Sequence, residues 1–376
     1  MSNNILHLCV DDSFTDIALQ YFEKASPQNN IVIKFGGNKL KKFKGKCFYI
    51  NSKDEVLKVI DQLNYSLIVI HALNNIWFDI IEKRAAHIKV VWIGWGYDYY
   101  DLFPQQVLLK ETKACVNSLI LQKNFIQFIY FQTFKPILSI YRNIRKKRII
   151  SKIDFFAPVL ENEYRLFEKM FNNQKIPKYL DFNYGVLEHD FIKGFENRLV
   201  SGNDILLGNS SSATCNHIEA IQILNKINLK NKSVVCPLSY GDLKYQKKIS
   251  SIGESYLKSS FTPLLQLLPI EEYISMVLSC GNVIMNHVRQ QAVGNIILML
   301  YLGAKIYLRK ENPIYSFLKE NNFTVYLVED ILNDPSILDK KLTIDEIESN
   351  RRRLKLFWSE EVIMAKTKTI ISLAVK

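Results

Sequence analysis

The feature that most limits the fold of this chain is the alternation of short apolar runs with segments of helical period. The runs "ILHLCV" (5–10), "SLIVIHA" (66–72) and "KVVWIGWG" (89–96) are mostly apolar and rich in Val, Ile and Leu. Nearly continuous apolar runs between amphipathic helices are typical of parallel strands that helices cover on both faces. The sequence therefore predicts an α/β fold with parallel sheets.

The alternation occurs twice along the chain. A polar stretch, "KGFENRLVSGND" (193–204), interrupts it, and a second series begins with "ILLGNS". Because 376 residues is long for one core, two domains are expected. We predict Rossmann-like doubly wound domains over residues 1–195 and 196–345, and closing helices over 346–376. Two such domains facing each other across a cleft, with ligands at the carboxyl ends of the strands, would form the GT-B arrangement.

Cysteine usage, hydropathy and charge narrow the setting. The six cysteines are scattered without a Cys-x-x-Cys pair, which favours a reducing compartment over a disulfide framework or structural zinc. No run approaches the roughly 18 apolar residues of a membrane span, and no signal peptide is expected. We expect a cytoplasmic protein, soluble or peripheral to a membrane. The net charge of +12 favours an anionic partner such as nucleotide phosphates, nucleic acid or a membrane face.

Three predicted junctions in the second half share one layout, in which a strand end leads into a polar loop and then a helix. Their candidate residues are Gly208, Asn209, Ser210 and His217 in the first, Tyr240 and Gly241 in the second, and Arg289, Gln290, Gln291, Gly294 and Asn295 in the third. The free N–H groups of a helix start bind phosphate, and an arginine adds a planar fork for its oxygens. Each junction also has a structural interpretation: a helix cap, a buried structural histidine and an ordinary turn. Three such loops meeting at one cleft would indicate a ligand that carries phosphate.

These junctions resemble motifs of the TDP-N-acetylfucosamine:lipid II N-acetylfucosaminyltransferase family, also called 4-alpha-L-fucosyltransferases. The matching segments are "LLGNSSSATCNHIEAI", "VVCPLSYGD", "RQQAVGN", "RKENPIY", "IHALNNIWF" and "WIGWGYDYYDL". The resemblance implies a GT-B glycosyltransferase fold and transfer of a 4-acetamido-4,6-dideoxyhexose from a TDP-sugar. The implied acceptor is a sugar on undecaprenyl diphosphate, used at the cytoplasmic face of the bacterial inner membrane for a surface polysaccharide such as enterobacterial common antigen or O-antigen.

The donor-side residues suit that implied reaction. The developing charge of a diphosphate leaving group needs fixed cations or dipoles, which Arg289 and the helix beginning at Gly294-Asn295 would supply. Gln290 and Gln291 would hold sugar or ribose hydroxyls, and Glu311 with Asn312, just past the predicted strand "KIYL", is a further candidate for them. We expect neither a cofactor nor a metal, because no Asp-x-Asp follows a strand and protein cations can replace Mg²⁺.

Acceptor chemistry is predicted at the strand ends of the first half. His71 and Asp98 could contact the acceptor hydroxyl and help to remove its proton, although Asp98 could equally cap the next helix. Asp12 is a weaker candidate. Donor and product of the resembling family are both α-linked, which implies retention. Because no secure carboxylate nucleophile is present, we hypothesise a front-face displacement assisted by the leaving phosphate.

A segment over residues 118–150 is rich in Phe, Tyr, Ile and Leu and ends in a basic cluster. The candidate membrane- or acceptor-binding residues are Trp95, Arg142, Arg145, Lys146, Lys147 and Arg148. Interfacial helices pair apolar anchors with cations that meet anionic headgroups. The alternative is a packed helical hairpin with a solvated basic end.

Two other functions remain open at this stage. A nucleotide-sugar epimerase of the same fold would not need the aromatic and basic segment. A basic nucleic-acid-binding protein would explain the charge but not the three loops, and no nucleic-acid-binding motif accompanies the cluster, so no nucleic-acid partner is expected. The leading prediction is a peripheral-membrane glycosyltransferase.

Overall fold

The computed structural model describes residues 4–10, 13–37, 39–103, 106–121, 135–171 and 174–374. They form two compact units, the first comprising Met1–Pro104, Ile137–Asp190 and Leu356–Lys376 and the second Gln105–Pro136 and Phe191–Lys355. The predicted Rossmann-like sheet in each half is confirmed. The units differ from the predicted ranges 1–195, 196–345 and 346–376 because each half of the chain contributes one helical segment to the other unit.

The first unit is built on a seven-stranded parallel sheet with the strand order β3-β2-β1-β4-β5-β6-β7. Its strands are β1 (Ile5–Val10), β2 (Asn30–Phe35), β3 (Lys46–Ile50), β4 (Leu67–His71), β5 (Lys89–Ile93), β6 (Phe155–Ala157) and β7 (Lys178–Tyr179). The central strands β1 and β4 are buried nearly throughout, which explains their continuous apolar runs.

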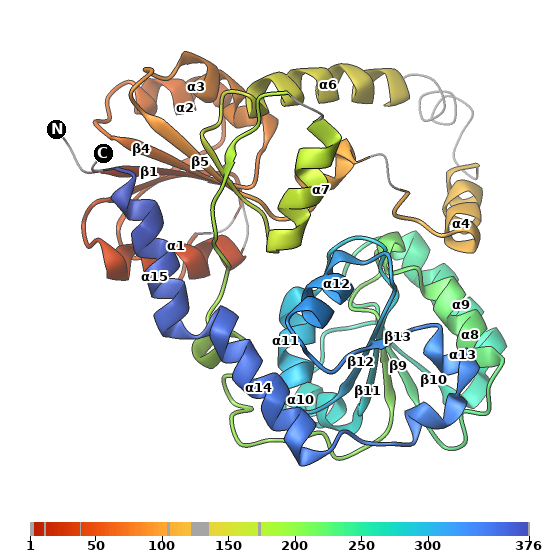
Figure 1. Ribbon diagram of the computed structural model, residues 1–376. Helices are drawn as coiled ribbons and strands as arrows, with labels where there is room; N and C mark the ends of the chain where they lie inside the picture. The colour runs from red at the N-terminus through yellow and green to blue at the C-terminus, as the bar shows by residue number, and fades with distance from the viewer. Residues whose placement is uncertain are drawn as a thin grey trace. The chain divides into compact units, whose positions relative to one another are not determined.

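Helices cover both faces of this sheet, with α1 and α15 on one face and α2 and α3 on the other (Figure 1). The helices of the unit are α1 (Ser13–Ala25), α2 (Lys53–Ile60), α3 (Phe78–Lys83), α6 (Lys135–Ile150), α7 (Glu161–Phe171) and α15 (Glu360–Ser372). The C-terminal helix α15 packs on α1, where Ile363 meets Tyr21 and Lys24 pairs with Glu360. This packing explains why the last residues belong to the first unit.

The second unit is built on a six-stranded parallel sheet with the order β10-β9-β8-β11-β12-β13. Its strands are β8 (Ile205–Leu207), β9 (Val234–Pro237), β10 (Phe261–Leu264), β11 (Asn282–Met285), β12 (Lys305–Leu308) and β13 (Tyr326–Leu327). Its helices are α4 (Lys110–Leu121), α8 (His217–Asn225), α9 (Leu243–Leu257), α10 (Ile270–Ser279), α11 (Val293–Tyr301), α12 (Pro313–Glu320), α13 (Asp330–Asn333) and most of α14 (Ile344–Trp358). Thr112 on α4 donates to Glu219 on α8 over 2.6 Å, which ties α4 to this unit.

The order of strands reverses direction at β1/β4 in the first unit and at β8/β11 in the second. In open α/β sheets, such switch points open a crevice at the carboxyl ends of the strands, and ligands bind there. His71 ends β4, and the first and third predicted loops follow β8 and β11. The fold therefore brings the predicted residues to the switch point of each sheet.

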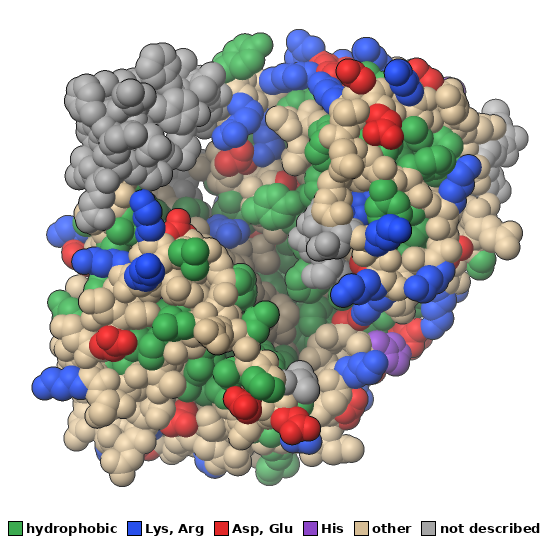
Figure 2. Space-filling model, turned by 180° about the vertical axis from the view of Figure 1, so that it is seen from behind, with side chains coloured by type: hydrophobic (Ala, Val, Ile, Leu, Met, Phe, Trp, Pro, Cys, Tyr) green, Lys and Arg blue, Asp and Glu red, His purple; other side chains and the backbone are tan. Residues whose placement is uncertain are grey.

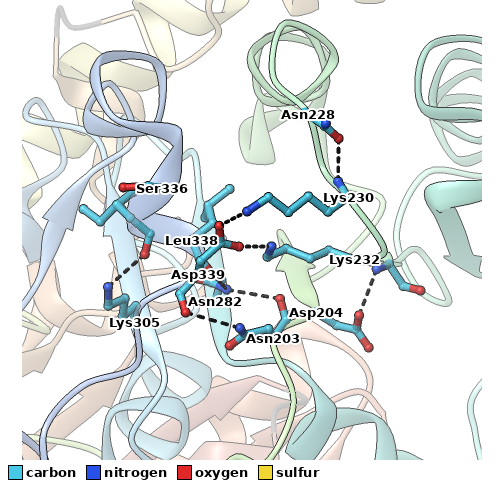
Figure 3. A network of polar contacts seen from close by, with 12 residues as sticks. Asn203, Asp204, Asn228, Lys230, Lys232, Asn282, Lys305, Ser336, Leu338 and Asp339 are labelled. Atoms are coloured by element: carbon cyan, nitrogen blue, oxygen red, sulfur yellow. Dashed lines mark hydrogen bonds and ion pairs between the residues drawn. The ribbon is translucent and has the colours of Figure 1, made fainter.

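A polar network closes the opposite, amino edge of the second sheet (Figure 3). Lys230 and Lys232 both pair with Asp339, and Lys305 donates to the carbonyl of Ile337 over 2.8 Å. Asn282, at the start of β11, donates to the carbonyl of Leu338 over 3.1 Å. The segment after α13 is thereby fixed to the ends of three strands.

We expect Asp339→Asn to lower the melting temperature by a few degrees at pH 7, since it removes the shared partner of two lysines. Hydrogen bonds from Lys230 and Lys232 lower the pKa of Asp339 to about 2. The folded pKa is thus below the unfolded value, so the stabilisation is present above about pH 4 and is lost as the pH falls towards 2. Thermal melting of both proteins between pH 7 and pH 3 checks this, with Asp345→Asn as a control for charge alone. A difference that stays constant over that range would contradict it.

Within the described residues, no helix is both long and apolar enough to cross a membrane. Lys and Arg side chains lie scattered among Asp and Glu on the face shown in Figure 2. The net positive charge is therefore not gathered into one patch on that face.

Candidate functional site

The three predicted loops of the second unit lie together at the carboxyl edge of its sheet. Asn209, after β8, donates to the hydroxyl of Tyr240, after β9, over 2.9 Å. Gln291, after β11, donates to Asn209 over 3.0 Å and accepts from Thr214 over 2.6 Å. These side-chain hydrogen bonds connect all three loops.

Glycine is required where the first two loops meet. Gly241 has φ 122°, and a Cβ atom there would lie 2.9 Å from the backbone carbonyl of Ser211. Gly208 has φ 68°, and a Cβ atom there would lie 2.7 Å from Nε2 of His217. A side chain at Gly241 would push the first two loops apart, and one at Gly208 would displace His217.

His217 lies beneath this loop. Its ring is fully buried, and Nδ1 lies 3.3 Å from the hydroxyl of Tyr245. Burial lowers its pKa to about 3, so the ring is neutral. Ser210 is also buried and faces the thiol of Cys215. These placements favour a supporting role for both residues over the ligand contact predicted from the sequence.

The third loop ends in a helix start without a side-chain cap. Helix α11 begins at Val293, one residue before the predicted start, and its N-cap is Ala292 in the left-handed region at φ 61°. Alanine carries no acceptor, so it cannot satisfy the amides of the first turn. Gly294 faces Phe191, whose ring would lie 3.1 Å from an added Cβ atom. Its lack of a side chain thus makes room for Phe191, whereas the sequence predicts a donor contact at Gly294.

Arg289 precedes this helix start and is partly exposed. Its guanidinium donates to the carbonyl of Gln290 over 3.3 Å. Burial, followed by the charge of Arg289 and the ring of His217, lowers the pKa of His287 to about 3. Gln290 is buried, whereas Gln291 is partly exposed. Arg289 is therefore close to the loops and is the cation nearest in sequence to the uncapped helix.

Arg309 directly follows β12 and is not among the site residues predicted from the sequence. Its guanidinium donates to Asn286 over 3.4 Å and pairs with Glu311 at 3.2 Å and Glu329 at 3.3 Å. Its Nε atom is buried and has no hydrogen-bond partner among the described residues. The position directly after an apolar strand, in "KIYLRKENP", was the signal that could have revealed it.

Glu311 and Asn312 differ in their exposure and in their hydrogen bonds within the protein. Glu311 is partly exposed; burial would raise its pKa, but its own backbone N–H and Arg309 hold the pKa below its usual value. Asn312 is buried and caps α12 by accepting from the N–H of Ile314 over 2.9 Å. Its Nδ2 atom has no partner among the described residues. Glu311 can therefore bind a ligand hydroxyl more readily than Asn312.

A cavity of about 200 Å³ adjoins the loops. Its polar lining includes Asn209, Tyr240 and Asn295, and its apolar wall comes from the end of β10 and from α10, including Leu264 and Tyr273. An apolar slot with polar groups at one edge suits a flat heterocyclic ring. The sequence predicts the polar residues Asn209, Tyr240 and Asn295 but none of the residues of the apolar wall.

In the first unit, the Asp98 carboxylate holds the surrounding backbone and side chains through hydrogen bonds. Its carboxylate is 4% exposed and accepts from the N–H of Leu73 at 2.8 Å, the indole of Trp92 at 2.7 Å and the N–H of Trp95 at 2.7 Å. Burial raises the pKa of Asp98 against the lowering effect of these donors. The arrangement argues against proton removal by Asp98 and favours a capping role, because its oxygens are already used.

His71 is fully buried, with Nε2 3.1 Å from Nδ1 of His7 and Nδ1 3.2 Å from the hydroxyl of Tyr184. Both ring nitrogens are thus engaged by side chains of the same unit. The direct contact with an acceptor hydroxyl predicted for His71 does not agree with this placement. Asp12 lies outside the described residues.

The basic cluster on α6 is largely paired within the first unit. Arg145 contacts Asp79 at 2.7 Å, Lys146 contacts Asp101 at 2.7 Å, and Arg148 pairs with Glu82. Lys146 is also buried, and Lys147 lies over the ring of Phe171. These ion pairs compete with headgroups for Arg145, Lys146 and Arg148, so the exposed Arg142 is the stronger candidate among the five cations. The membrane-binding role stays a prediction. Residues 122–134 of the predicted segment lie outside the described residues.

Several solved structures share the fold of this chain. The chain is similar to sucrose-phosphate synthase from Thermosynechococcus elongatus, with 10% identity, 98% of each chain covered and a TM-score of 0.63. It is similar to HepE from Anabaena in complex with UDP and glucose, with 10% identity, 97% of this chain and 99% of that chain covered, and a TM-score of 0.62. The apo form of the lipopolysaccharide outer core galactosyltransferase WaaB matches with 8% identity over 98% of this chain and 99% of that chain, with a TM-score of 0.62. The chain has the GT-B glycosyltransferase fold.

The family is shown by a separate match. The model of the 4-alpha-L-fucosyltransferase family, glycosyl transferase group 56, matches residues 173–363, which is just over half of the chain. The matched range contains all three loops of the second unit together with Arg289, Arg309 and Glu311. The chain belongs to the 4-alpha-L-fucosyltransferase family of glycosyltransferases.

Proposed function

We propose that this glycosyltransferase transfers a 4-acetamido-4,6-dideoxyhexose from a TDP-sugar to a saccharide linked to undecaprenyl diphosphate, in the synthesis of a bacterial surface polysaccharide. The observation that carries the donor half of the proposal is the uncapped start of α11 beside Arg289 and Gln291. A helix start of this kind, with a guanidinium next to it, binds a diphosphate through backbone N–H groups and a planar fork of donors.

The other donor contacts follow from the same edge of the sheet. The cavity lined by Asn209, Tyr240, Asn295 and Tyr273 would take the thymine ring. Glu311, oriented by Arg309, would accept from hydroxyls of the ribose or the sugar. HepE, which shares the fold, was solved with UDP and glucose, which supports a nucleoside diphosphate as the kind of ligand.

We further propose a retaining, metal-independent reaction. The acceptor oxygen attacks the anomeric carbon from the side that the diphosphate leaves, the bond from that carbon to the phosphate oxygen breaks, and the acceptor proton passes to the departing phosphate. Arg289 and the α11 amides would stabilise the charge that develops on the diphosphate. Capture of a covalent glycosyl-enzyme adduct by mass spectrometry would contradict this mechanism.

We propose that the enzyme associates with the cytoplasmic face of the inner membrane through α6. The outer surface of α6 carries Tyr141, which is 71% exposed, and Ile144, which is 63% exposed, next to the exposed Arg142. Exposed apolar side chains beside a cation suit an interfacial helix. Such a position would bring the enzyme to a lipid-linked acceptor.

We expect TDP to raise the melting temperature by several degrees, UDP and GDP to raise it less, and EDTA to change none of these shifts. Ligand at about 100 times its Kd stabilises a folded protein by about 2.7 kcal/mol, which differential scanning fluorimetry detects readily. A response to UDP or GDP alone would remove TDP as the donor nucleotide. Indifference to all three, together with salt-sensitive binding to any DNA duplex, would favour a nucleic-acid-binding protein.

The transferred sugar is identified by product mass. Incubation with a panel of TDP-sugars and a membrane lipid extract should give a lipid-linked glycan heavier by one 4-acetamido-4,6-dideoxyhexose residue. Conversion of the nucleotide sugar itself into an isomer, without any heavier glycan, would identify an epimerase instead.

A further inference from the structure

Five polar side chains form one hydrogen-bonded chain through the first unit. Asn30 at the start of β2 contacts His7 on β1 at 3.1 Å, His7 contacts His71 on β4 at 3.1 Å, and His71 contacts Tyr184 at 3.2 Å. The indole of Trp95 donates to the hydroxyl of Tyr184 over 2.6 Å. Asn30, His7 and His71 are at most 1% exposed, whereas Tyr184 and Trp95 are partly exposed. This hydrogen-bonded chain of side chains therefore connects the interior of the sheet to the surface.

The amide of Asn30 sets the position of every proton in this chain. Its Nδ2 atom faces the carbonyls of Phe22 and Ser26 and the carboxylate of Glu23, at 3.2, 2.7 and 2.8 Å, all of which only accept. Its Oδ1 atom therefore faces His7 and needs a donor. Nε2 of His7 must carry that proton.

The histidine tautomers follow in sequence. Burial lowers the pKa of His7 to about 4, against a raising effect of Asn30, and burial and His7 lower the pKa of His71 well below its usual value, so both rings are neutral at pH 7. Nδ1 of His7 is then an acceptor, and Nε2 of His71 donates to it. Nδ1 of His71 in turn accepts from Tyr184. The reverse arrangement would place two acceptors, Nε2 of His7 and Oδ1 of Asn30, against each other.

The hydroxyl of Tyr184 is thereby fixed in direction. Its proton is committed to His71, and an indole N–H, which can only donate, already points at its oxygen. A group that approaches Tyr184 from outside can meet this oxygen only as a donor. The hydrogen-bonded chain ends at the buried amide of Asn30, and its two imidazole rings are neutral and desolvated. It therefore contains no group that can accept a proton from a ligand.

Aromatic rings surround this oxygen. Trp95 lies 4.3 Å from Tyr184 between ring centroids, and Phe14, which is 40% exposed, packs edge-on against Trp95 at 5.5 Å. The C–H face of a pyranose packs well on such rings, and its hydroxyls supply the donor. An alkyl chain could cover the rings but would offer no donor to this oxygen.

We propose that Phe14, Trp95 and Tyr184 form a saccharide-binding subsite, in which a sugar hydroxyl donates to Tyr184 and the Asn30–His7–His71 chain fixes that polarity. Resting on the proposed function, we infer that the subsite holds a sugar ring of the acceptor. Tyr184 binds and orients this ring and does not remove its proton, in agreement with transfer of the acceptor proton to the leaving phosphate.

Long-range ¹H–¹⁵N spectra of histidine-labelled protein test the polarity directly. We expect His7 and His71 to be neutral at pH 7 with the proton on Nε2, assigned with single His7→Asn and His71→Gln variants. A proton on Nδ1 of His71, or a charged ring, would overturn the proposal, because the oxygen of Tyr184 would then not be restricted to accepting.

Binding is tested on the indole signal of Trp95, assigned with Trp95→Phe. At least one member of a panel of methyl glycopyranosides, at up to about 100 mM because single rings bind weakly, should shift this signal saturably. Tyr184→Phe should weaken that binding about three- to tenfold, the value of one hydrogen bond. Tyr164→Phe is the matched control, since it removes a hydroxyl that donates to the carbonyl of Pro177 at 2.9 Å, and should leave binding unchanged.

In the transfer reaction, Tyr184→Phe should raise KM for the lipid-linked acceptor by a similar factor, leave kcat within about twofold, and keep the full melting shift with TDP. A collapse of kcat without a change in KM would overturn the proposal in favour of proton transfer. No glycoside shift, or a shift with thymidine alone, would overturn it while a normal TDP response leaves the donor proposal standing. Glycoside binding without any TDP response would overturn the donor proposal and leave the saccharide subsite standing.

Discussion

Arg289→Ala should abolish the stabilisation by TDP and lower kcat/KM for sugar transfer by about 10²- to 10³-fold, the usual effect of removing one fixed donor to a developing charge. The guanidinium donates to the carbonyl of Gln290, in the loop that leads into the uncapped first turn of α11. In the proposed complex the α11 amides and the guanidinium would act on the same phosphate oxygens, and helix amides alone bind a dianion weakly in water. Fluorimetry with TDP and steady-state kinetics measure the two effects separately.

Two further variants make this result specific. Arg289→Lys keeps the charge but loses the planar fork, so it should recover only part of both effects. Arg351→Ala is the matched control: this partly buried arginine of the same unit donates to the carbonyl of Tyr301 at 2.8 Å and pairs with Glu348, away from the three loops. It should cost stability without weakening the response to TDP. A full TDP shift in Arg289→Ala would mean that the diphosphate binds elsewhere.

The strands and the three loops were predictable because their signals are local. A fully buried parallel strand requires a continuous apolar run, and the loops that follow β8, β9 and β11 carry the polar residues expected at the carboxyl edge of such a sheet. The hydrogen bonds that join Asn209, Tyr240 and Gln291 agree with the expectation that these loops converge. The roles of these residues in donor binding remain predictions.

Partners that are distant in sequence explain what could not be predicted. From the sequence alone, the cations of α6 indicate a membrane-binding cluster. The fold places Asp79, Glu82 and Asp101 beside them, although these partners are distant in sequence. His71 reads as a reactive residue at a strand end, but His7 and Tyr184 occupy both its nitrogens. The exchange of segments between units has the same origin, since α4 and α15 pack on helices about 100 or more residues away.

Asp98→Asn should destabilise the first unit by about 2–5 kcal/mol, because it disrupts a buried carboxylate that accepts from three N–H groups. One oxygen accepts from Leu73 and Trp92 and the other from Trp95, so either orientation of an asparagine amide turns its NH₂ group against at least one of these donors. The loop that carries Trp95 would lose its fixed position as well. Urea-induced unfolding followed by circular dichroism measures the loss of stability.

The same variant separates the two roles that the sequence left open for Asp98. If the carboxylate also removed a proton from the acceptor, Asp98→Asn would lower kcat sharply in addition to lowering the unfolding free energy. Asp79→Asn, in the same unit, is the matched control, since its carboxylate pairs with Lys53 and Arg145 near the surface and its loss should cost at most about 1 kcal/mol. A carboxylate that only caps the loop requires two results. Asp98→Asn should lose more stability than Asp79→Asn, and it should bind the acceptor more weakly because Trp95 is displaced.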